Sequence, residues 1–137
     1  MTVPASRTLR VAVVGAGYVA THHLAALSRL DFVEVVGLCD SNLTAAEALA
    51  KRFKIGQVAA TLADLAGAKP EVVYVLTPPA SHASLAIAAM EMGCHVLVEK
   101  PMADTAADCE AMRAKSQATG LKLGVNHSDL FDPVLMR

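Results

Sequence analysis

The sequence predicts an α/β fold, a doubly wound parallel sheet with helices on both faces in three layers. Short apolar runs alternate along the chain with segments of helical periodicity. The runs are nearly continuous in apolar residues, which is typical of strands covered on both faces, and the loops between them are short. Regular alternation of strands and helices therefore predicts parallel pairing, because each crossover helix returns the chain to the same end of the sheet.

The first half of the chain is expected to contain two long strands, two helices and a short third strand. Leu24 and Leu27, with Val19 and Leu30, have the spacing of one helix face. Thr44-Ala45-Ala46-Glu47 fits a capping box in the second helix. The elements predicted here are strands at Leu9–Val14, Val33–Cys39 and near Gln57–Ala59, and helices at Tyr18–Leu30 and Asn42–Phe53.

The second half continues the alternation. Thr77-Pro78-Pro79 ends its first strand, because proline cannot continue a sheet ladder. Ser81 is expected to cap the next helix and Gly93 to end it, while Gly120 ends the last helix. The elements predicted here are strands at Glu71–Leu76, Cys94–Val98 and Leu121–Val125, and helices at Ser81–Met92 and Asp104–Thr119. One stripe of the last helix consists of Ala107, Ala111, Ala114 and Ala118.

These elements predict a strand order and a place for a ligand. Right-handed crossovers leave few topologies, and the order 3-2-1-4-5-6 is the expected one. Ligands of doubly wound sheets bind outside the carboxyl ends of the strands, where the strand order reverses. The segments expected at that edge are Gly15–Ala20, Asp40, Thr77–His82 and Glu99–Pro101.

The composition excludes several classes of protein. A chain of 137 residues has room for one domain, and 54% hydrophobic against 18% charged residues is the opposite of a disordered composition. Twelve Lys and Arg against thirteen Asp and Glu leave no basic excess, so no nucleic-acid partner is expected. No apolar run approaches the roughly 20 residues of a membrane-spanning helix, and no cleavable signal is apparent, so no membrane association is expected.

Cysteine and histidine spacing gives no sign of a metal. Cys39, Cys94 and Cys109 are widely spaced and form no C-x-x-C pair, so neither a disulfide framework nor a zinc site is indicated. We interpret them as buried small hydrophobes in a reducing compartment, which favours the cytoplasm. No two of the five histidines stand four residues apart, and no metal site is expected.

A glycine-rich motif lies between the first strand and the first helix. Gly15-Ala16-Gly17-Tyr18-Val19-Ala20 reads G-x-G-x-x-A. Gly15 permits the tight turn, Gly17 lets a pyrophosphate approach the backbone, and Ala20 lets the helix pack close to the strand. The helix N-terminus then offers free N–H groups to phosphates. Glycines in such turns also occur for purely structural reasons, but this context favours a dinucleotide.

Asp40 closes the second strand and supports the same interpretation. It stands near the distance of roughly 20 residues at which a carboxylate accepts hydrogen bonds from the adenosine ribose. The alternative is that Asp40 only caps the next helix. Because a carboxylate repels a 2′-phosphate and Ser41, Asn42 and Leu43 offer no cation, NAD is favoured over NADP.

Glu99-Lys100-Pro101 follows the fifth strand at the same edge. A lysine beside a bound nicotinamide is placed to hydrogen-bond a substrate oxygen and to move its proton. Pro101 restricts Lys100, and its peptide bond is a candidate for the cis form. The alternative is a surface Glu–Lys pair, and spacing alone does not decide between the two.

Four segments in this order resemble the N-terminal domain of the glucose–fructose oxidoreductase / inositol dehydrogenase / MocA (Gfo/Idh/MocA) family. They are VAVVGAGYVATHH, VVGLCD, VLTPPASH and AMEMGCHVLVEKPMA. The resemblance covers roughly Leu9 to Pro133 and implies a Rossmann fold. It also implies an oxidoreductase that transfers hydride between NAD and a sugar, a polyol or a related hydroxylated small molecule.

The resemblance also implies roles for individual residues. Lys100 corresponds to the family's catalytic lysine, and the Thr-Pro-Pro turn lies over the dinucleotide. The cofactor-binding residues implied are Gly15, Ala16, Gly17, Tyr18, Val19, Asp40, Thr77, Pro78, His82, Glu99 and Lys100. His82 has a structural alternative in the first turn of its helix, and His23 has one on the face packed on the sheet. Asn126 and His127 end the last strand near the nicotinamide, where a structural turn is equally expected.

The domain organisation follows from the same resemblance. Residues 1–126 are expected to form the dinucleotide-binding domain, and residues 127–137 to begin the connection to a second α/β domain. In the family that domain supplies most of the substrate pocket, the usual oligomer interface and a proton-transferring histidine. A homo-oligomer is therefore expected, while residues 1–137 alone are expected to be inactive.

An alternative hypothesis from a different functional class is that the domain binds a dinucleotide but catalyses no reaction. The domain would then be a dinucleotide-binding sensor or a partner-binding subunit. A hydrolase is not indicated, because no G-x-S-x-G motif is present. The sensor has no need of Lys100 at the hydride-transfer edge, so Lys100 favours the enzyme.

Overall fold

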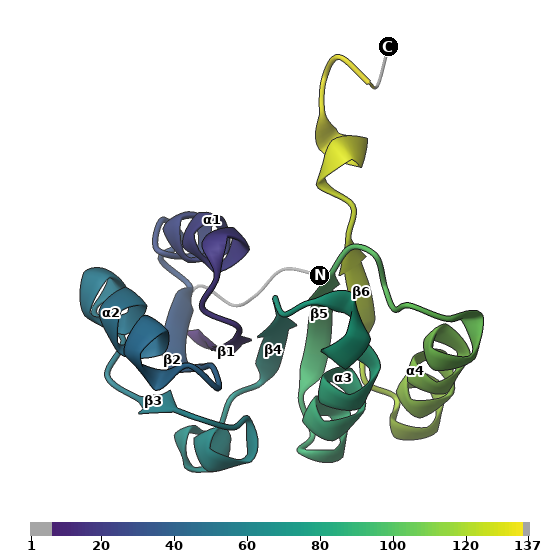
Figure 1. The fold of residues 1–137 in the computed structure, drawn as a ribbon, viewed down its shortest axis with the longest axis horizontal. Coiled ribbons are helices and arrows are strands. Elements are labelled where there is room, and N and C mark those ends of the chain that lie inside the picture. Colours follow the sequence, from purple (N-terminus) through teal and green to yellow (C-terminus); the bar gives the residue numbers. More distant parts are fainter. Residues whose placement is uncertain (1–6, 136–137) are drawn as a thin grey trace.

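The computed structural model describes residues 7–135, which form a six-stranded parallel sheet flanked by helices (Figure 1). The strands are β1 (Leu9–Val14), β2 (Val33–Cys39), β3 (Val58–Ala59), β4 (Val72–Val75), β5 (His95–Glu99) and β6 (Leu123–Asn126). The α-helices are α1 (Tyr18–Leu27), α2 (Leu43–Phe53), α3 (His82–Glu91) and α4 (Ala106–Thr119). Short 3-10 turns are η1 (Ala63–Ala68), η2 (Pro79–Ser81) and η3 (Ser128–Phe131).

The strand order is β3-β2-β1-β4-β5-β6, which confirms the predicted topology. All neighbouring strands run parallel, and β1 lies between β2 and β4. The β1–β2 register shifts at one point, where Val11 pairs with Val35 but Ala12 pairs with Gly37. The order reverses between β1 and β4, so the predicted ligand edge lies above these two strands.

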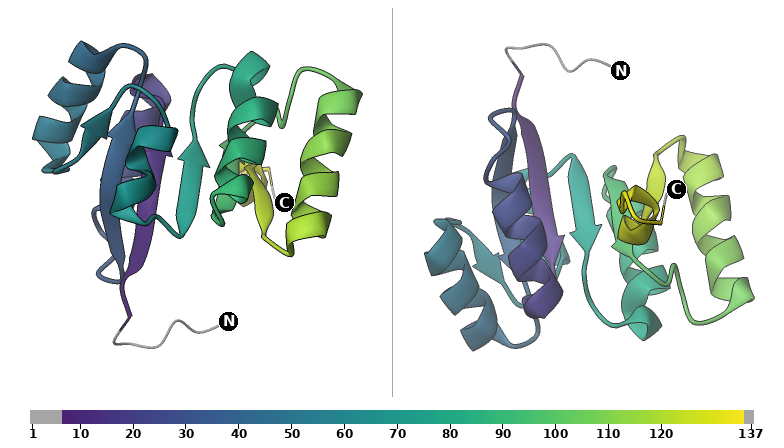
Figure 2. Two further views of the ribbon diagram at one scale, coloured as in Figure 1. Left: turned by 90° about the horizontal axis from the view of Figure 1, so that it is seen from below. Right: turned by 90° about the horizontal axis from the view of Figure 1, so that it is seen from above.

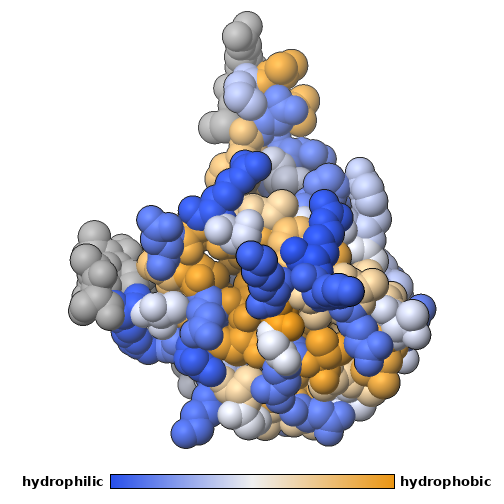
Figure 3. Space-filling view, turned by 90° about the vertical axis from the view of Figure 1, so that its left-hand side faces the viewer, coloured by the Kyte–Doolittle hydropathy of each residue, from blue (hydrophilic) through white to orange (hydrophobic). Residues whose placement is uncertain are grey.

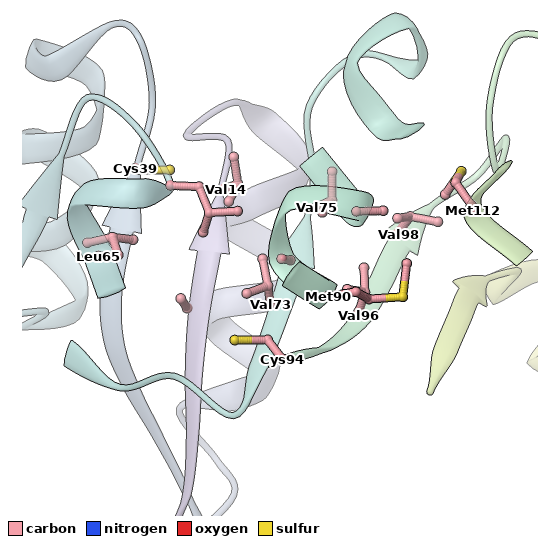
Figure 4. Packing of buried hydrophobic residues seen from close by; sticks show 14 of the residues in the cluster. Val14, Cys39, Leu65, Val73, Val75, Met90, Cys94, Val96, Val98 and Met112 are labelled. Atoms are coloured by element: carbon pink, nitrogen blue, oxygen red, sulfur yellow. The ribbon is translucent and has the colours of Figure 1, made fainter. Parts of the chain in front are cut away.

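The helices cover the sheet in two pairs (Figure 2). On one face α1 and α2 pack against β1 and β2, around a core that includes Val11, Val13, Leu24 and Leu38. On the opposite face lie α3, α4 and η1, and Figure 4 shows their core side chains converging on Val14, Val73, Val75 and Val98. The three-layer arrangement is therefore the predicted one.

The strand β1 in the middle of the sheet is buried on both faces, whereas β5 and β6 are not. Residues Val11–Val14 of β1 are all buried, as the continuous apolar run predicts. In β5 buried and half-buried residues alternate, with Val96 and Val98 beneath α3 and Leu97 on the opposite face. All four residues of β6 are half-buried. The expectation of two covered faces is therefore wrong for β5 and β6.

The last described residues form a segment that projects from the sheet after β6 (Figure 1). Leu130, Phe131, Val134 and Leu135 are all more than half exposed. Figure 3 shows apolar side chains standing among polar ones on this segment. The end of this segment thus projects beyond the sheet that β1–β6 form (Figure 1).

Helix boundaries follow local signals that differ in part from the prediction. Helix α1 ends at Leu27 rather than Leu30. Asn42 caps α2 by accepting a hydrogen bond from the Ala45 N–H at 3.1 Å, so the capping box at Thr44–Glu47 is wrong. Asparagine is one of the strongest N-caps, and it stands where the chain turns out of β2.

The last helix buries a different face from the predicted one. The stripe Ala107, Ala111, Ala114 and Ala118 is exposed, and Met112 is the buried residue of α4. A buried methionine removes far more apolar area from water than an alanine does, and this decides which face packs on the sheet. Gly120 ends α4 with a φ of +70°, as expected.

Candidate functional site

In the turn after β1, Gly15 and Gly17 are explained by different structural features. Gly15 has a φ of +107°, and a Cβ there would stand 2.8 Å from the carbonyl oxygen of Leu76. The turn itself therefore requires Gly15. A Cβ on Gly17 would have no atom within 4 Å. The packing of the described residues gives no reason for glycine there, whereas a ligand close to the backbone would.

The N-terminus of α1 lies directly after the glycine turn and has no side-chain cap. Gly17 is the N-cap residue, and α1 has no side-chain cap and no acidic residue in its first turn. The first N–H groups of α1 therefore have no side-chain acceptor. Such free N–H groups, together with the helix dipole, bind phosphates at helix N-termini in other proteins. Ala20 is fully buried, as expected of the small residue at the third motif position.

Asp40 lies beside the turn and is hydrogen-bonded to it. Its Oδ2 accepts from the Ala16 N–H at 2.8 Å, and its Oδ1 accepts from the Asn42 N–H at 2.8 Å. The carboxylate is half-buried. Each oxygen accepts one of these hydrogen bonds and keeps further acceptor capacity. Asn42, not Asp40, supplies the side-chain cap of α2, so the capping alternative for Asp40 is not what the structure shows.

His82 takes a place that differs from the expected contact with the cofactor. It is fully buried, with Nε2 2.7 Å from the Thr77 carbonyl oxygen and Nδ1 2.9 Å from the Pro101 carbonyl oxygen. The η2 turn directs the first residue of α3 inward. His82 therefore joins the Thr77 turn to the Pro101 turn and presents no exposed atom to a ligand.

The Thr77 turn is held by hydroxyl groups. Ser81 Oγ donates to the Pro78 carbonyl oxygen at 2.9 Å and lies 2.6 Å from Thr77 Oγ1. The predicted side-chain cap from Ser81 on α3 is absent for that reason. Thr77 is half-buried and Pro78 is exposed, so both reach the surface of the ligand edge.

The Glu99-Lys100-Pro101 turn presents an exposed lysine beside a half-buried glutamate. The Lys100–Pro101 peptide bond is cis. Glu99 Oε1 lies 2.7 Å from His23 Nε2 and 2.6 Å from Asn126 Nδ2, and Oε2 accepts from the Lys100 N–H at 3.2 Å. Although burial by itself raises the pKa of Glu99, these hydrogen bonds and the nearby imidazole hold that pKa below its ordinary value.

A cavity of about 540 Å³ opens beside this turn. Its walls come from α1, from the ends of β4 and β6, and from the Glu99–Lys100 turn. Its lining residues are Val19, His22, His23, Ala26, Leu76, Thr77, Glu99, Lys100, Asn126 and Ser128. Four predicted site residues meet here, namely Val19, Thr77, Glu99 and Lys100, whereas Asp40 lies beside the glycine turn.

The other predicted residues are placed as follows. Tyr18 is exposed in the first turn of α1 and packs edge-on against His22, with 4.7 Å between ring centroids. His127 is exposed after β6 and does not line the cavity that Asn126 lines. A second cavity of about 670 Å³ lies at the amino-terminal ends of the strands, near Arg10 and Val33. It contains none of the predicted site residues.

The sequence did not predict the contacts of Glu99 with His23 and Asn126, nor those of His82 with two turns. His23, Glu99 and Asn126 lie far apart in the sequence, and nothing in their local patterns pairs them. The one available signal is topological, because β5 and β6 are parallel neighbours and their last residues, Glu99 and Asn126, meet at one edge. His82 bridging two turns had no sequence signal.

Residues 7–135 contain no cluster of three or more His, Cys, Asp or Glu side chains arranged to hold a metal ion. None of the helices in this range is long and apolar enough to span a bilayer. Cys39 and Cys94 are free and buried, and Cys109 is free and half-buried. Burial raises the pKa of the Cys39 thiol to about 12, with Asp40 and Asp64 adding to the shift, so that thiol is not a nucleophile at neutral pH.

Comparisons with known proteins agree with this geometry. Residues 9–127 match the family GFO_IDH_MocA, described as an oxidoreductase family with an NAD-binding Rossmann fold. The chain is 38% identical over 126 residues to 4-carboxy-2-hydroxymuconate-6-semialdehyde dehydrogenase of Sphingobium sp., covering 91% of this chain and 40% of that protein. It is 36% identical over 128 residues to D-glucoside 3-dehydrogenase of Escherichia coli, covering 92% and 36%.

Solved structures match over almost the whole chain. The WlbA dehydrogenase from Chromobacterium violaceum, in complex with NADH and UDP-GlcNAcA, superposes with a TM-score of 0.91 at 28% identity. That match covers 99% of this chain and 40% of WlbA. Similar structures hold NAD or NADH, and some hold NADP. This chain therefore spans about two fifths of the length of the proteins it resembles.

Proposed function

This chain belongs to the Gfo/Idh/MocA family of oxidoreductases and forms an NAD-binding Rossmann domain, and we propose that NAD lies along its carboxyl sheet edge from Asp40 to the Lys100 cavity. The observation that carries this arrangement is the open space at Gly17. A Cβ there would meet no protein atom within 4 Å beyond its chain neighbours and the backbone of its own helix, directly in front of the uncapped α1 N-terminus. The residues present thus fit a pyrophosphate.

Asp40 is proposed to bind the adenosine ribose. Its two oxygens are fixed by the Ala16 and Asn42 N–H groups at 2.8 Å and keep capacity for ribose hydroxyls. Its negative charge opposes a 2′-phosphate, and the chain after it supplies no cation in Ser41, Asn42 or Leu43. NAD is therefore the preferred cofactor over NADP.

Lys100 is proposed as the catalytic residue at the other end of the cofactor. NAD, when bound, supplies the hydride acceptor. The Lys100 side chain is exposed beside the cavity, where its Nζ is proposed to hydrogen-bond a substrate hydroxyl or carbonyl oxygen. In that role the ammonium form donates a proton to a carbonyl oxygen during reduction, and the neutral amine accepts the hydroxyl proton during oxidation. Val19 and Thr77 form the neighbouring walls. Pro78 and Thr77 belong to the turn proposed to lie over the dinucleotide.

The proposed substrate is a sugar, a polyol or a related hydroxylated small molecule. The names of the relatives, a glucoside dehydrogenase among them, support this class. Because the chain spans about two fifths of its relatives' length, we propose that a second α/β domain, reached through residues 127–137, completes the substrate pocket. A cytoplasmic homo-oligomer is part of the same proposal, and the free buried Cys39 and Cys94 support a reducing compartment.

Calorimetry with NAD and NADP tests the cofactor assignment on the 137-residue chain. We expect binding of NAD and weaker binding of NADP. NADH formation by a protein extended through the second domain, measured across polyols and aldoses, tests the reaction. Turnover that is lost in Lys100→Ala, with NAD binding retained, supports the catalytic assignment. Binding without turnover on any substrate would favour a dinucleotide sensor instead.

A further inference from the structure

The Glu99 carboxylate joins three elements of the fold. His23 in α1 and Asn126 at the end of β6 both direct a nitrogen at Glu99 Oε1, at 2.7 Å and 2.6 Å. Glu99 Oε2 accepts the N–H of Lys100, the first residue after β5. The helix that follows the glycine turn and the turn that carries the lysine are thus linked through one side chain.

The His23 ring is fixed as well as bonded. The His23 and Glu99 side chains are each 15% exposed. Behind the imidazole, Tyr74 of β4 packs edge-on at 5.6 Å between ring centroids and 86° between planes. An ionised carboxylate only accepts hydrogen bonds, so His23 Nε2 carries the proton in this contact. Buried, charge-assisted hydrogen bonds of this kind are the strong ones.

The surroundings of Glu99 favour its charged form. Burial acts against the charge, but the hydrogen bonds from Asn126 and His23 and the Lys100 N–H outweigh it, and the pKa of Glu99 is lowered. The other titratable side chains that line the cavity are Lys100 and His22, and Tyr74 packs against His23.

We propose that His23 and Asn126 are positioning residues, which hold the Glu99 carboxylate and through it fix the Lys100 turn relative to the glycine turn. This inference rests on the proposed function, because the two segments that Glu99 links are the ones proposed to bind the pyrophosphate and to carry the catalytic lysine. Neither residue needs to touch the cofactor through its bonded nitrogen. The link sets the separation between the α1 N-terminus, where the pyrophosphate is proposed to bind, and Lys100 at the cavity.

Variants of His23 separate this role from packing. His23→Phe keeps a ring against Tyr74 and removes the donor, whereas His23→Gln keeps an N–H donor. His95→Phe is the control for loss of an imidazole and one hydrogen bond elsewhere, because His95 lies at the amino-terminal end of the strand that carries Glu99, where its Nδ1 accepts from the Lys122 N–H at 3.0 Å. Asn126→Ala removes the second donor. Circular dichroism establishes that each variant is folded.

Two measurements on the 137-residue chain follow. The first is a carbon NMR titration of the Glu99 carboxyl in chain labelled at glutamate, and the second is NAD affinity by calorimetry. In His23→Phe and Asn126→Ala we expect the Glu99 pKa to rise above that of the unaltered chain and NAD affinity to fall by roughly fivefold, the size of a contact coupling. His23→Gln should restore most of both, and His95→Phe should change neither.

The outcomes distinguish this inference from the cofactor proposal. An unaltered Glu99 titration in His23→Phe and Asn126→Ala overturns the link itself. A raised pKa with unchanged NAD affinity overturns its positioning role. If the unaltered chain binds no NAD, the proposed function fails while the titration still reports on the link. If His23→Phe does not fold, Asn126→Ala and His23→Gln decide the result by the same two measurements.

Discussion

The Asp40 carboxylate accepts hydrogen bonds from the glycine turn and from Asn42, and it is proposed to bind the adenosine ribose as well. Asp40→Ala removes the hydrogen bonds to Ala16 and Asn42 as well as those proposed to the ribose. We expect NAD binding to weaken by about 1–3 kcal/mol, the usual worth of hydrogen bonds to a charged group. Asp40→Asn keeps an acceptor and removes the charge, so it should lose less NAD affinity and gain affinity for NADP. Calorimetry measures both, and equal affinity of the unaltered chain for the two cofactors would contradict the assignment.

Gly17 gives a sharper test, because its side-chain position is empty of protein. Gly17→Val should abolish NAD binding and leave the circular dichroism spectrum unchanged, since a Cβ at this position meets no protein atom within 4 Å and the added side chain is expected to occupy the proposed pyrophosphate position. Gly56→Val is the matched control, because a Cβ there also meets no atom within 4 Å. Unchanged nucleotide affinity in Gly17→Val would reduce the motif to a tight turn.

Glu99 makes stability depend on pH in a defined direction. Its pKa is lower in the folded chain than in the unfolded chain. Such a group stabilises the fold above its unfolded pKa, and this contribution disappears as the pH falls through its folded pKa. In urea unfolding, the advantage of the unaltered chain over Glu99→Gln should therefore be largest near neutral pH and should shrink in acid. A difference that stays constant with pH would show that the charge of Glu99 does not stabilise the fold.

Sequence patterns predict functional residues where local geometry needs a particular residue type. The G-x-G-x-x-A spacing located Gly15, Gly17 and Ala20, whose turn conformation, open position and burial are those expected. The burial of His82 could not be predicted, because its partners are backbone carbonyl groups of two other turns. The same holds for His23, whose partner is 76 residues away.

At the level of elements, the N-cap of α4 offers a clean measurement. The Thr105 hydroxyl accepts from the Asp108 N–H at 3.1 Å in an exposed position. Thr105→Ala should destabilise the chain by about 1 kcal/mol, because a helix N–H loses its partner. Thr105→Ser should stay close to the unaltered chain, and urea unfolding compares the three. Equal stability of the alanine and serine variants would show that this cap contributes nothing.

The presence of each helix and strand was easier to predict than where it ends and which of its faces is buried. Every predicted strand and helix is present, since apolar runs and helical spacing extend over whole elements. The cap of α2 was misassigned because Asn42 and Thr44 are both suitable residues, and the position where β2 turns away selects Asn42. The buried face of α4 was misassigned because alanines have no strong preference for the interior, and the single Met112 decides.

For the whole molecule, exposed apolar surface predicts association. Leu130, Phe131, Val134 and Leu135 are exposed on the projecting segment, where Figure 3 shows apolar side chains. In the sheet, β5 is buried on one face only, and the residues of β6 are all half-buried. Large apolar patches are uncommon on stable monomers. We expect the 137-residue chain to form dimers or larger assemblies by light scattering, and Phe131→Asp to shift it toward monomer. A monomer at tens of micromolar, roughly the range where such surfaces associate, would contradict this.

The proposed second domain leads to a prediction for the 137-residue chain on its own. Hydride transfer needs the reacting atoms held about 3–3.5 Å apart, and loss of that orientation costs up to about 7–11 kcal/mol. Residues 7–135 provide Lys100 and the cavity beside it, and the proposed second domain would complete the substrate pocket. The 137-residue chain should therefore give no detectable NADH from polyols or sugars. Steady turnover by it would show that no second domain is needed.

The central position of β1 constrains how the chain is assembled during synthesis. This strand is made first, yet it lies between β2 and β4 and has no free edge in the finished sheet. Its second edge stays unpaired until Val72–Val75 have left the ribosome. The nascent chain therefore exposes an apolar strand with an unpaired side while the residues between Val14 and Val75 are translated, which takes roughly several seconds at about 5–20 residues per second. Pausing between β3 and β4 should consequently increase chaperone binding and aggregation, whereas pausing after β4 should not.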